Sequence, residues 1–143
     1  MRLFAESSAV LSWLLGEAHA ELVRGPLAQA ELVVASDLAL VECDRVLTRI
    51  VAAGDQPEAI VADRRAVLER AASHWNLVPV VAEVIERARR PFPLEPVRTL
   101  DALHLASALA ARSRLHGLAI LSLDRRLRDN ARQLGFDLVP ASL

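Results

Sequence analysis

Short apolar runs alternate with longer amphipathic stretches along most of the chain. Residues 3–5, 32–34 and 118–123 are apolar or nearly so, which is typical of buried strands. Between these runs, apolar residues recur at helical spacing, for example over residues 10–15 and 38–50. Strands that alternate with helices predict an α/β fold with a mostly parallel central sheet and helices on both faces.

Local signals refine the expected boundaries. Ser7 and Ser8 are expected to cap the first helix, and Thr99 to cap a buried helix over residues 100–111. Pro26 predicts a break or kink in a helix over residues 18–29, and Pro79 predicts an edge or irregular position for a strand over residues 77–81. The other expected elements are helices over residues 37–54, 57–73, 84–88 and 125–134 and a last strand over residues 136–139.

The composition narrows the class of protein. With 143 residues, 53% of them hydrophobic, the chain is expected to form one domain over residues 1–143. All 17 basic residues are arginine, and the lack of lysine excludes P-loop, Schiff-base and Ser-Lys chemistry. The formal charge of −1 gives no global basic field, so contact with nucleic acid would require a local patch.

We expect the protein to act in the cytoplasm. Cys43 is the one cysteine, so it cannot form an internal disulfide, and it is expected to pack in the core. The first residues lack the basic region and the uninterrupted apolar stretch of a signal peptide. No apolar run approaches the length that spans a membrane, so no membrane partner is expected.

Carboxylates follow several of the apolar runs. Glu6, Asp101 and Asp124 each stand at the end of an apolar stretch, and Glu42 lies inside one. In an open α/β fold the strand ends and helix starts at one edge of the sheet form the ligand crevice, so these acids are expected to converge. Converging carboxylates are typical ligands of Mg²⁺ or Mn²⁺.

Each acid also has a purely structural explanation. Glu6, Asp101 and Asp124 suit the first turn or the cap of a helix, where a negative charge contributes about 0.3–1 kcal/mol. The buried character of the helix after Asp101 weakens this explanation, because an ionised carboxylate beside an apolar layer needs a cation or several donors.

Glu42 can instead pair with Arg45 or Arg49 on its own helix, a contact of a few tenths of a kcal/mol. The four acids have no shared role only if all four structural explanations are correct at once. The joint pattern therefore favours a metal site. The histidines lack zinc-ligand spacing, and His104 is expected to pack or hydrogen-bond near Asp101.

Four segments resemble the signature of the PIN domain found in VapC-like toxins, in order and in approximate spacing. They are FAESSA (residues 4–9), DLALVE (residues 37–42), LDALHLA (residues 100–106) and LSLDRRL (residues 121–127). The last two are the most specific. The first departs from the family pattern, because Glu6 stands where the family usually has Asp.

This resemblance implies a single PIN-like α/β domain that acts as a metal-dependent endoribonuclease, the toxin of a type II toxin–antitoxin pair. It implies that Glu6, Glu42, Asp101 and Asp124 hold one or two Mg²⁺ or Mn²⁺ ions. Carboxylate-bound cations suit phosphodiester hydrolysis, which is expected to leave a 5′-phosphate and a 3′-hydroxyl.

Candidate substrate contacts lie beside the acids. Ser8 and Ser122 can orient a ligand or a water molecule, although hydroxyls at helix starts are commonly caps. Arg125 and its neighbours Arg126 and Arg128 can touch RNA phosphates, although arginines on a polar helix face are commonly just solvated.

The resemblance also implies an RNA substrate, a small VapB-like antitoxin as partner and a homodimer. Two other functions compete with this interpretation. A phosphoacceptor receiver domain shares the acidic pocket but needs a lysine that this chain lacks. The second is a PIN-like module that binds RNA or protein and is catalytically weak or inactive. In that interpretation, the change from Asp to Glu6 indicates that catalysis has been lost.

Overall fold

A five-stranded sheet forms the centre of the computed structural model, which describes residues 1–143. Its strands lie in the order β3-β2-β1-β4-β5, and every neighbouring pair is parallel. Their bounds are Arg2–Ala5 for β1, Leu32–Ser36 for β2, Asn76–Val78 for β3, Leu118–Leu121 for β4 and Leu138–Val139 for β5. The α/β fold with a parallel central sheet is confirmed.

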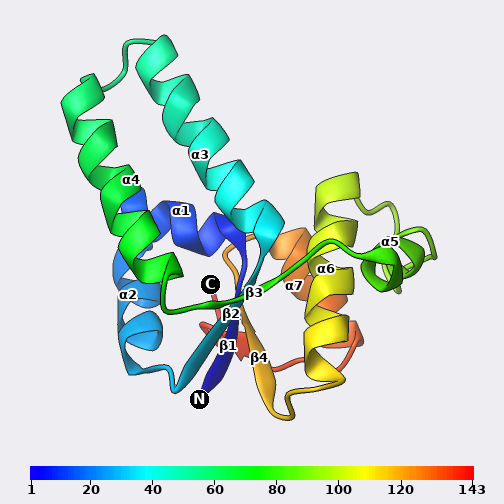
Figure 1. Cartoon of the computed structure of the whole chain (residues 1–143). Coiled ribbons are helices and arrows are strands. Elements are labelled where there is room, and N and C mark those ends of the chain that lie inside the picture. The colour runs from blue at the N-terminus through cyan, green and yellow to red at the C-terminus, as the bar shows by residue number, and fades with distance from the viewer.

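Helices cover both faces of this sheet (Figure 1). They are α1 (Ser7–Leu15), α2 (Ala20–Gln29), α3 (Asp37–Ala52), α4 (Glu58–Ala72), α5 (Ala82–Ala88), α6 (Thr99–Arg112) and α7 (Arg125–Gln133). Because side chains alternate along a strand, β1 sends Leu3 and Ala5 toward α1 and α2, and Phe4 toward α6. The short apolar runs of the sequence are therefore buried on both sides.

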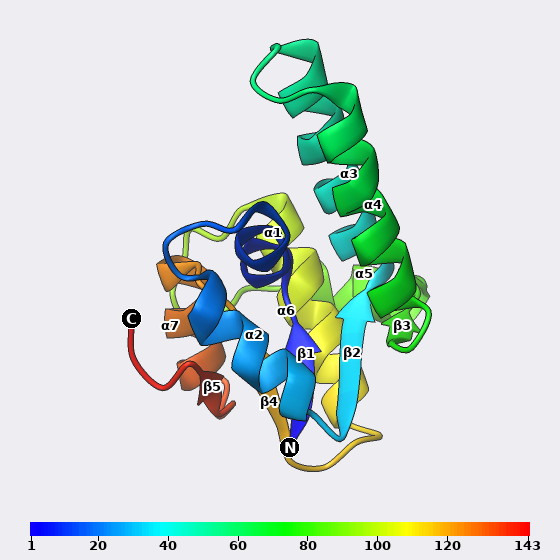
Figure 2. The ribbon, with the colours of Figure 1, turned by 90° about the vertical axis from the view of Figure 1, so that its left-hand side faces the viewer.

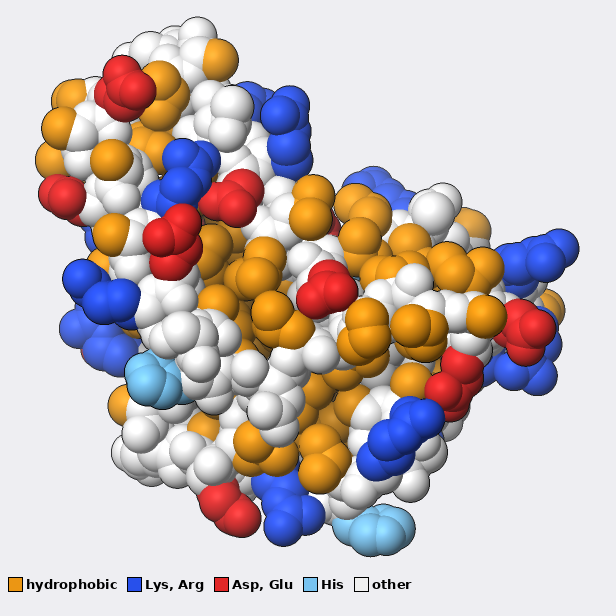
Figure 3. Space-filling view, viewed as in Figure 1, with side chains coloured by type: hydrophobic (Ala, Val, Ile, Leu, Met, Phe, Trp, Pro, Cys, Tyr) orange, Lys and Arg blue, Asp and Glu red, His pale blue; other side chains and the backbone are white.

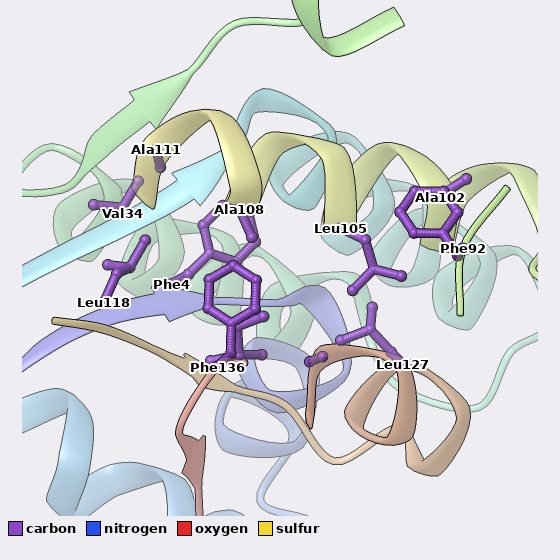
Figure 4. Close-up of a cluster of buried hydrophobic side chains, with 12 residues drawn as sticks. Phe4, Val34, Phe92, Ala102, Leu105, Ala108, Ala111, Leu118, Leu127 and Phe136 are labelled. Carbon is purple, nitrogen blue, oxygen red and sulfur yellow. The ribbon is translucent and has the colours of Figure 1, made fainter. Parts of the chain in front are cut away.

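Helix α6 lies closest to one face of the sheet. Figure 4 shows its residue Ala108 next to Phe4 and its residue Leu105 directed at Leu127 of α7, all within one cluster. Leu105 and Ala108 are fully buried. The alanines of α6 have short side chains, so the helix backbone packs close to the strands and its N-terminal turn, which carries Asp101, is held over the end of the sheet.

Several expected boundaries differ from the structure. Helix α2 runs without a break through Pro26, because Leu22, the residue whose carbonyl loses its donor, lies at the exposed surface. Strand β3 begins at Asn76 and ends before Pro79, which provides no backbone N–H for pairing. Strand β3 is an edge strand, as the proline predicted. Strands β4 and β5 are each two residues shorter than expected.

Two of the expected helix caps are wrong. Glu6, not Ser7 or Ser8, caps α1, and its longer side chain accepts the N–H of Ser8. Thr99 lies inside α6, whose cap position is taken by Arg98 without a side-chain bond. Carboxylates accept the N–H groups of a helix start at least as well as hydroxyls do, so a serine beside an acid is a weak boundary signal.

Helices α3 and α4 form a hairpin that projects from the body of the molecule (Figures 1 and 2). The end of the hairpin near the sheet is anchored in the core through Cys43 of α3 and Leu68 of α4, and Leu47 and Val61 are buried within the hairpin as well. None of the helices combines the length and the apolar character that a transmembrane helix requires.

Candidate metal and nuclease site

The predicted acids meet at the end of the sheet where the parallel strands finish. Glu6 directly follows β1, and Asp124 follows β4, the strand that pairs with β1 from Arg2↔Leu118 to Ala5↔Leu121. The N–H of Glu6 donates to the carbonyl of Leu121 at 3.0 Å, which joins the two strand ends. The starts of α3 and α6 lie at the same edge (Figure 1), so the topology brings together acids far apart in the sequence.

Glu6 is buried, and every hydrogen bond of its carboxylate is made to the protein. Its Oε1 accepts the Ser7 hydroxyl at 2.7 Å and the Ser8 N–H at 3.0 Å. Its Oε2 accepts the hydroxyls of Ser8 and Ser122, the latter at 2.8 Å. Only 4% of Glu6 is exposed, so these donors replace water around the charge.

The two candidate substrate serines both belong to this network. Ser8 Oγ accepts the N–H of Leu123 at 3.0 Å, and Ser122 Oγ accepts the N–H of Asp124 at 3.1 Å. Each hydroxyl thus connects Glu6 with the turn between β4 and α7. Contact of these serines with a substrate stays a prediction.

Asp124 is the cap of α7. Its Oδ1 accepts the N–H of Leu127 at 2.8 Å, and its Oδ2 accepts no hydrogen bond from the protein. The structural explanation of this acid is therefore correct, and it leaves the second oxygen without a protein donor. A capping acid and a ligand are compatible roles, because a carboxylate has two oxygens.

Asp101 lies in the first turn of α6 and is half-buried. Its carboxylate accepts no hydrogen bond from a side chain or the backbone and forms no ion pair. Burial, then the negative charges of Asp124 and Glu6, raise the pKa of its carboxyl above the ordinary value. Glu42 adds to the increase, and His104 acts in the opposite sense. The acids are thus close enough for their charges to interact, and the carboxylate of Asp101 has no hydrogen-bond or ion-pair partner.

Glu42 is hydrogen-bonded to Nε2 of His104, and not to Arg45 or Arg49 as its alternative explanation required. His104 follows Asp101 by one turn of α6 and is 1% exposed, while its Nδ1 has no partner. Burial acts to lower the pKa of His104, but the bond to Glu42 and the charges of Glu6 and Asp101 raise it overall. His104 is therefore buried near Asp101, as expected, and its hydrogen-bond partner is Glu42.

The oxygens left free define what the site can bind. Asp101 has both oxygens free, Asp124 has Oδ2 and Glu42 has Oε2. No three Asp, Glu, His or Cys side chains are arranged as a preformed metal site. The uncompensated charge and the all-carboxylate donor set nevertheless fit a hard divalent cation such as Mg²⁺ or Mn²⁺.

The family model described as PIN domain matches residues 3–133. The chain belongs to the PIN domain family. A search of curated protein sequences found no significant match.

Solved structures share the fold of this PIN domain at low sequence identity. VapC20 of Mycobacterium tuberculosis, described as a sarcin-ricin loop cleaving toxin, is 17% identical with a TM-score of 0.64, covering 94% of this chain and 95% of its own. A toxin–antitoxin complex from Klebsiella pneumoniae is 16% identical with a TM-score of 0.61, covering 94% and 93%.

PAE2754 of Pyrobaculum aerophilum is 18% identical with a TM-score of 0.57, covering 98% of this chain and 85% of its own. At these identities the similarity establishes the fold. The predicted resemblance to the PIN domain of VapC-like toxins is confirmed.

Arg128 of the PIN domain has a role that the sequence pattern conceals. Arg128 is not available to RNA, because it is buried and donates to the carbonyls of Ser122 at 2.9 Å and Pro140 at 2.7 Å. Its run of polar neighbours resembles a solvated face and gives no signal of burial.

Cys43 packs in the core as expected, and burial, then the charges of Glu42 and Asp44, raise its pKa to about 12, which excludes a thiolate nucleophile.

Proposed function

We propose that this PIN domain is a Mg²⁺- or Mn²⁺-dependent endoribonuclease whose acidic site consists of Glu6, Glu42, Asp101 and Asp124. The observation that carries this proposal is the unpaired Asp101 carboxylate, whose pKa is raised by burial and then by Asp124 and Glu6. The negative charge of a half-buried carboxylate without a partner lowers the stability of the fold unless a cation or a ligand offsets it.

The residues around the acids set their geometry. His104 orients Glu42 from the buried side of α6, and the N–H of Leu127 orients Asp124. A divalent cation, when bound, supplies a Lewis acid that polarises the scissile phosphate and makes an attacking water more acidic. Hydrolysis is then expected to leave a 5′-phosphate and a 3′-hydroxyl.

The test of this function is cleavage of a panel of structured RNAs by the purified protein. We expect cleavage with Mg²⁺ or Mn²⁺ and none after chelation, with the Asp101→Asn protein as the control for a contaminating nuclease. A folded parent protein that binds RNA but never cleaves it would instead support the alternative, a PIN-like binding module without catalysis.

Arginines at the rim of the acidic site are the candidate contacts for RNA phosphates. Arg98 and Arg126 line one small hollow together with Asp101. Both are exposed, and their guanidinium groups bond to no protein group, as is true of the predicted contact Arg125 at the start of α7. Guanidinium groups beside acids that bind a cation can hold the phosphates next to the reacting one.

Replacing Arg98 and Arg126 together by glutamine is expected to weaken RNA binding uniformly across sequences. Two lost phosphate contacts reduce the salt dependence of binding, by a slope of roughly 0.7 per contact for single strands. Binding is measured by titration at several salt concentrations with chelated protein, which prevents cleavage. The control is Arg132→Gln, whose guanidinium pairs with Asp129 on the same helix as Arg126. An unchanged salt slope in the double variant would exclude these two contacts.

We further propose that the protein is a cytoplasmic toxin restrained by a small VapB-like antitoxin, and that it forms a homodimer. The support is the Klebsiella pneumoniae structure of the same fold, which is a toxin–antitoxin complex. An apolar groove between β3, α5 and α6, lined in part by Leu77, Val81 and Val84, offers a seat for an apolar helix of the antitoxin. Figure 3 shows hydrophobic side chains exposed along this face.

The partner is expected to be encoded beside the gene for this protein, to co-purify with it and to inhibit cleavage. The change Val81→Asp should weaken the complex at least 10-fold, because a charge cannot be buried against an apolar helix.

Light scattering of the toxin alone should give the mass of a dimer. A strict monomer at micromolar concentration would contradict the homodimer, and a genome neighbourhood without a small partner gene would contradict the antitoxin.

A further inference from the structure

Glu6 differs from the other three acids in how its oxygens are used. Asp101, Asp124 and Glu42 each keep at least one oxygen without a protein donor, whereas Glu6 accepts two hydrogen bonds on each oxygen. A carboxylate offers about four acceptor sites. The protein therefore fills the acceptor capacity of Glu6 and leaves that of the other acids open.

The directions of these hydrogen bonds determine which side chain can occupy position 6. Ser8 Oγ and Ser122 Oγ each accept a backbone N–H, from Leu123 and Asp124, and each donates its own proton to Glu6, with the two hydroxyl oxygens 3.3 Å apart. Because hydrogen-bond donors reach both terminal atoms of the Glu6 side chain, both must be acceptors, which a carboxylate provides and an amide, with its NH₂ group, does not. The network thus runs from the β4–α7 turn through two serines to Glu6.

The extra methylene of glutamate suits this role. From its cap position on α1, the Glu6 side chain reaches the hydroxyl of Ser122 on the neighbouring strand end as well as the N–H of Ser8 on its own helix. It thereby ties the β1–α1 junction to the β4–α7 junction, and the second of these carries Asp124.

We propose that Glu6 is a positioning residue: through Ser8 and Ser122 its carboxylate fixes the turn that carries Asp124, and the direct metal contacts are made by Asp101, Asp124 and Glu42. This inference rests on the proposed metal-dependent function. The positions of the acids along the chain and the family resemblance both place Glu6 among the metal ligands, whereas its hydrogen bonds favour the positioning role.

The two roles predict opposite signs for Glu6→Gln in the metal-free protein. A positioning residue loses bonds to buried hydroxyls, so the melting temperature should fall by about 4 °C or more. If repulsion from the neighbouring acids outweighs these bonds, as expected for a ligand whose charge only the cation neutralises, the neutral replacement should raise the melting temperature. Thermal unfolding in excess chelator measures the sign.

The second readout is the rise in melting temperature on addition of saturating Mn²⁺. The Glu6→Gln protein should retain this rise, because its three other acids still provide free oxygens, while its RNA cleavage falls roughly 10–100-fold, the loss typical of a group that orients a ligand. Absence of the Mn²⁺-induced rise in folded Glu6→Gln, or a higher metal-free melting temperature, would overturn the proposal.

A second variant tests the network if Glu6→Gln does not fold. Ser122→Ala removes the hydroxyl between Glu6 and the Asp124 N–H, and it should lower the metal-free melting temperature and the cleavage rate while the Mn²⁺-induced rise remains. The matched control is Ser12→Ala on α1, whose hydroxyl is equally buried and has no partner. A Ser122→Ala protein that behaves like Ser12→Ala would refute the positioning role.

These outcomes are separable from the failure of the proposed function itself. If the parent protein shows neither a Mn²⁺-induced rise nor cleavage of any RNA, the metal-dependent nuclease is refuted. A positioning role that fails alone leaves the parent's cleavage and Mn²⁺ response intact, and only the Glu6→Gln and Ser122→Ala results differ from expectation.

Discussion

Replacement of Asp101 by asparagine is expected to abolish RNA cleavage and, at the same time, to stabilise the metal-free protein. Cleavage should fall by roughly 10³-fold or more, because an amide cannot offer the charge that a divalent cation requires. The metal-free melting temperature should rise by about 2–4 °C, the shift that 1 kcal/mol produces in a domain of this size. A rate assay and thermal unfolding in chelator measure the two effects.

The stabilisation follows from the surroundings of Asp101. Burial and the neighbouring acids penalise its charged form, and no donor offsets the penalty. An isosteric neutral group removes the penalty and disturbs no hydrogen bond of the fold. The loss of activity and the gain of stability thus have one cause, which a merely structural residue does not show.

The control is Asp129→Asn on α7. Asp129 is exposed and pairs with Arg132 at 3.1 Å, so its replacement should change neither cleavage nor the melting temperature by more than the small effect of a surface pair. If folded Asp101→Asn keeps the activity of the parent, Asp101 does not belong to the catalytic site. If it loses activity but also stability, the uncompensated charge is not what distinguishes this residue.

The elements of the fold were predictable because strand and helix periodicities are local. The runs that form β1, β2 and β4 are continuous and apolar, and burial on both faces of a parallel sheet leaves this pattern. The exact boundaries were not predictable from the same signals. At Glu6 and Ser7 two capping residues compete, and Glu6, which is the cap, also accepts the hydroxyl of Ser122, 116 residues away, a contact that no local signal contains.

The position of the candidate site was predictable for a topological reason, but its internal bonds were not. Acids after parallel strands lie at one edge whatever the rest of the sequence is. The contact between Glu42 and His104 joins residues 62 positions apart on different helices, and no periodicity of either helix indicates it. The structural and functional explanations of Asp124 also proved compatible, because one oxygen caps α7 and the other stays free.

The second large effect concerns metal and pH together. In the metal-free protein, stability is expected to fall as the pH rises from 5 to 8. The pKa of His104 is raised, so its stabilising contribution is complete below the unfolded value near 6.5 and is lost as the pH rises through the folded value. The raised pKa of Asp101 has the same sign, starting from its lower ordinary value.

Mn²⁺ or Mg²⁺ is expected to reverse this trend. The cation needs deprotonated carboxylates, so its stabilisation grows with pH, and at 100 times the dissociation constant it amounts to about 2.7 kcal/mol. Melting temperatures recorded from pH 5 to 8 with excess chelator and with excess Mn²⁺ should therefore diverge as the pH rises, and cleavage should appear over the same interval. In Asp101→Asn the two series should coincide. Parallel curves in the parent protein would mean that the cation does not bind these acids, and the metal site would be refuted even if RNA were cleaved.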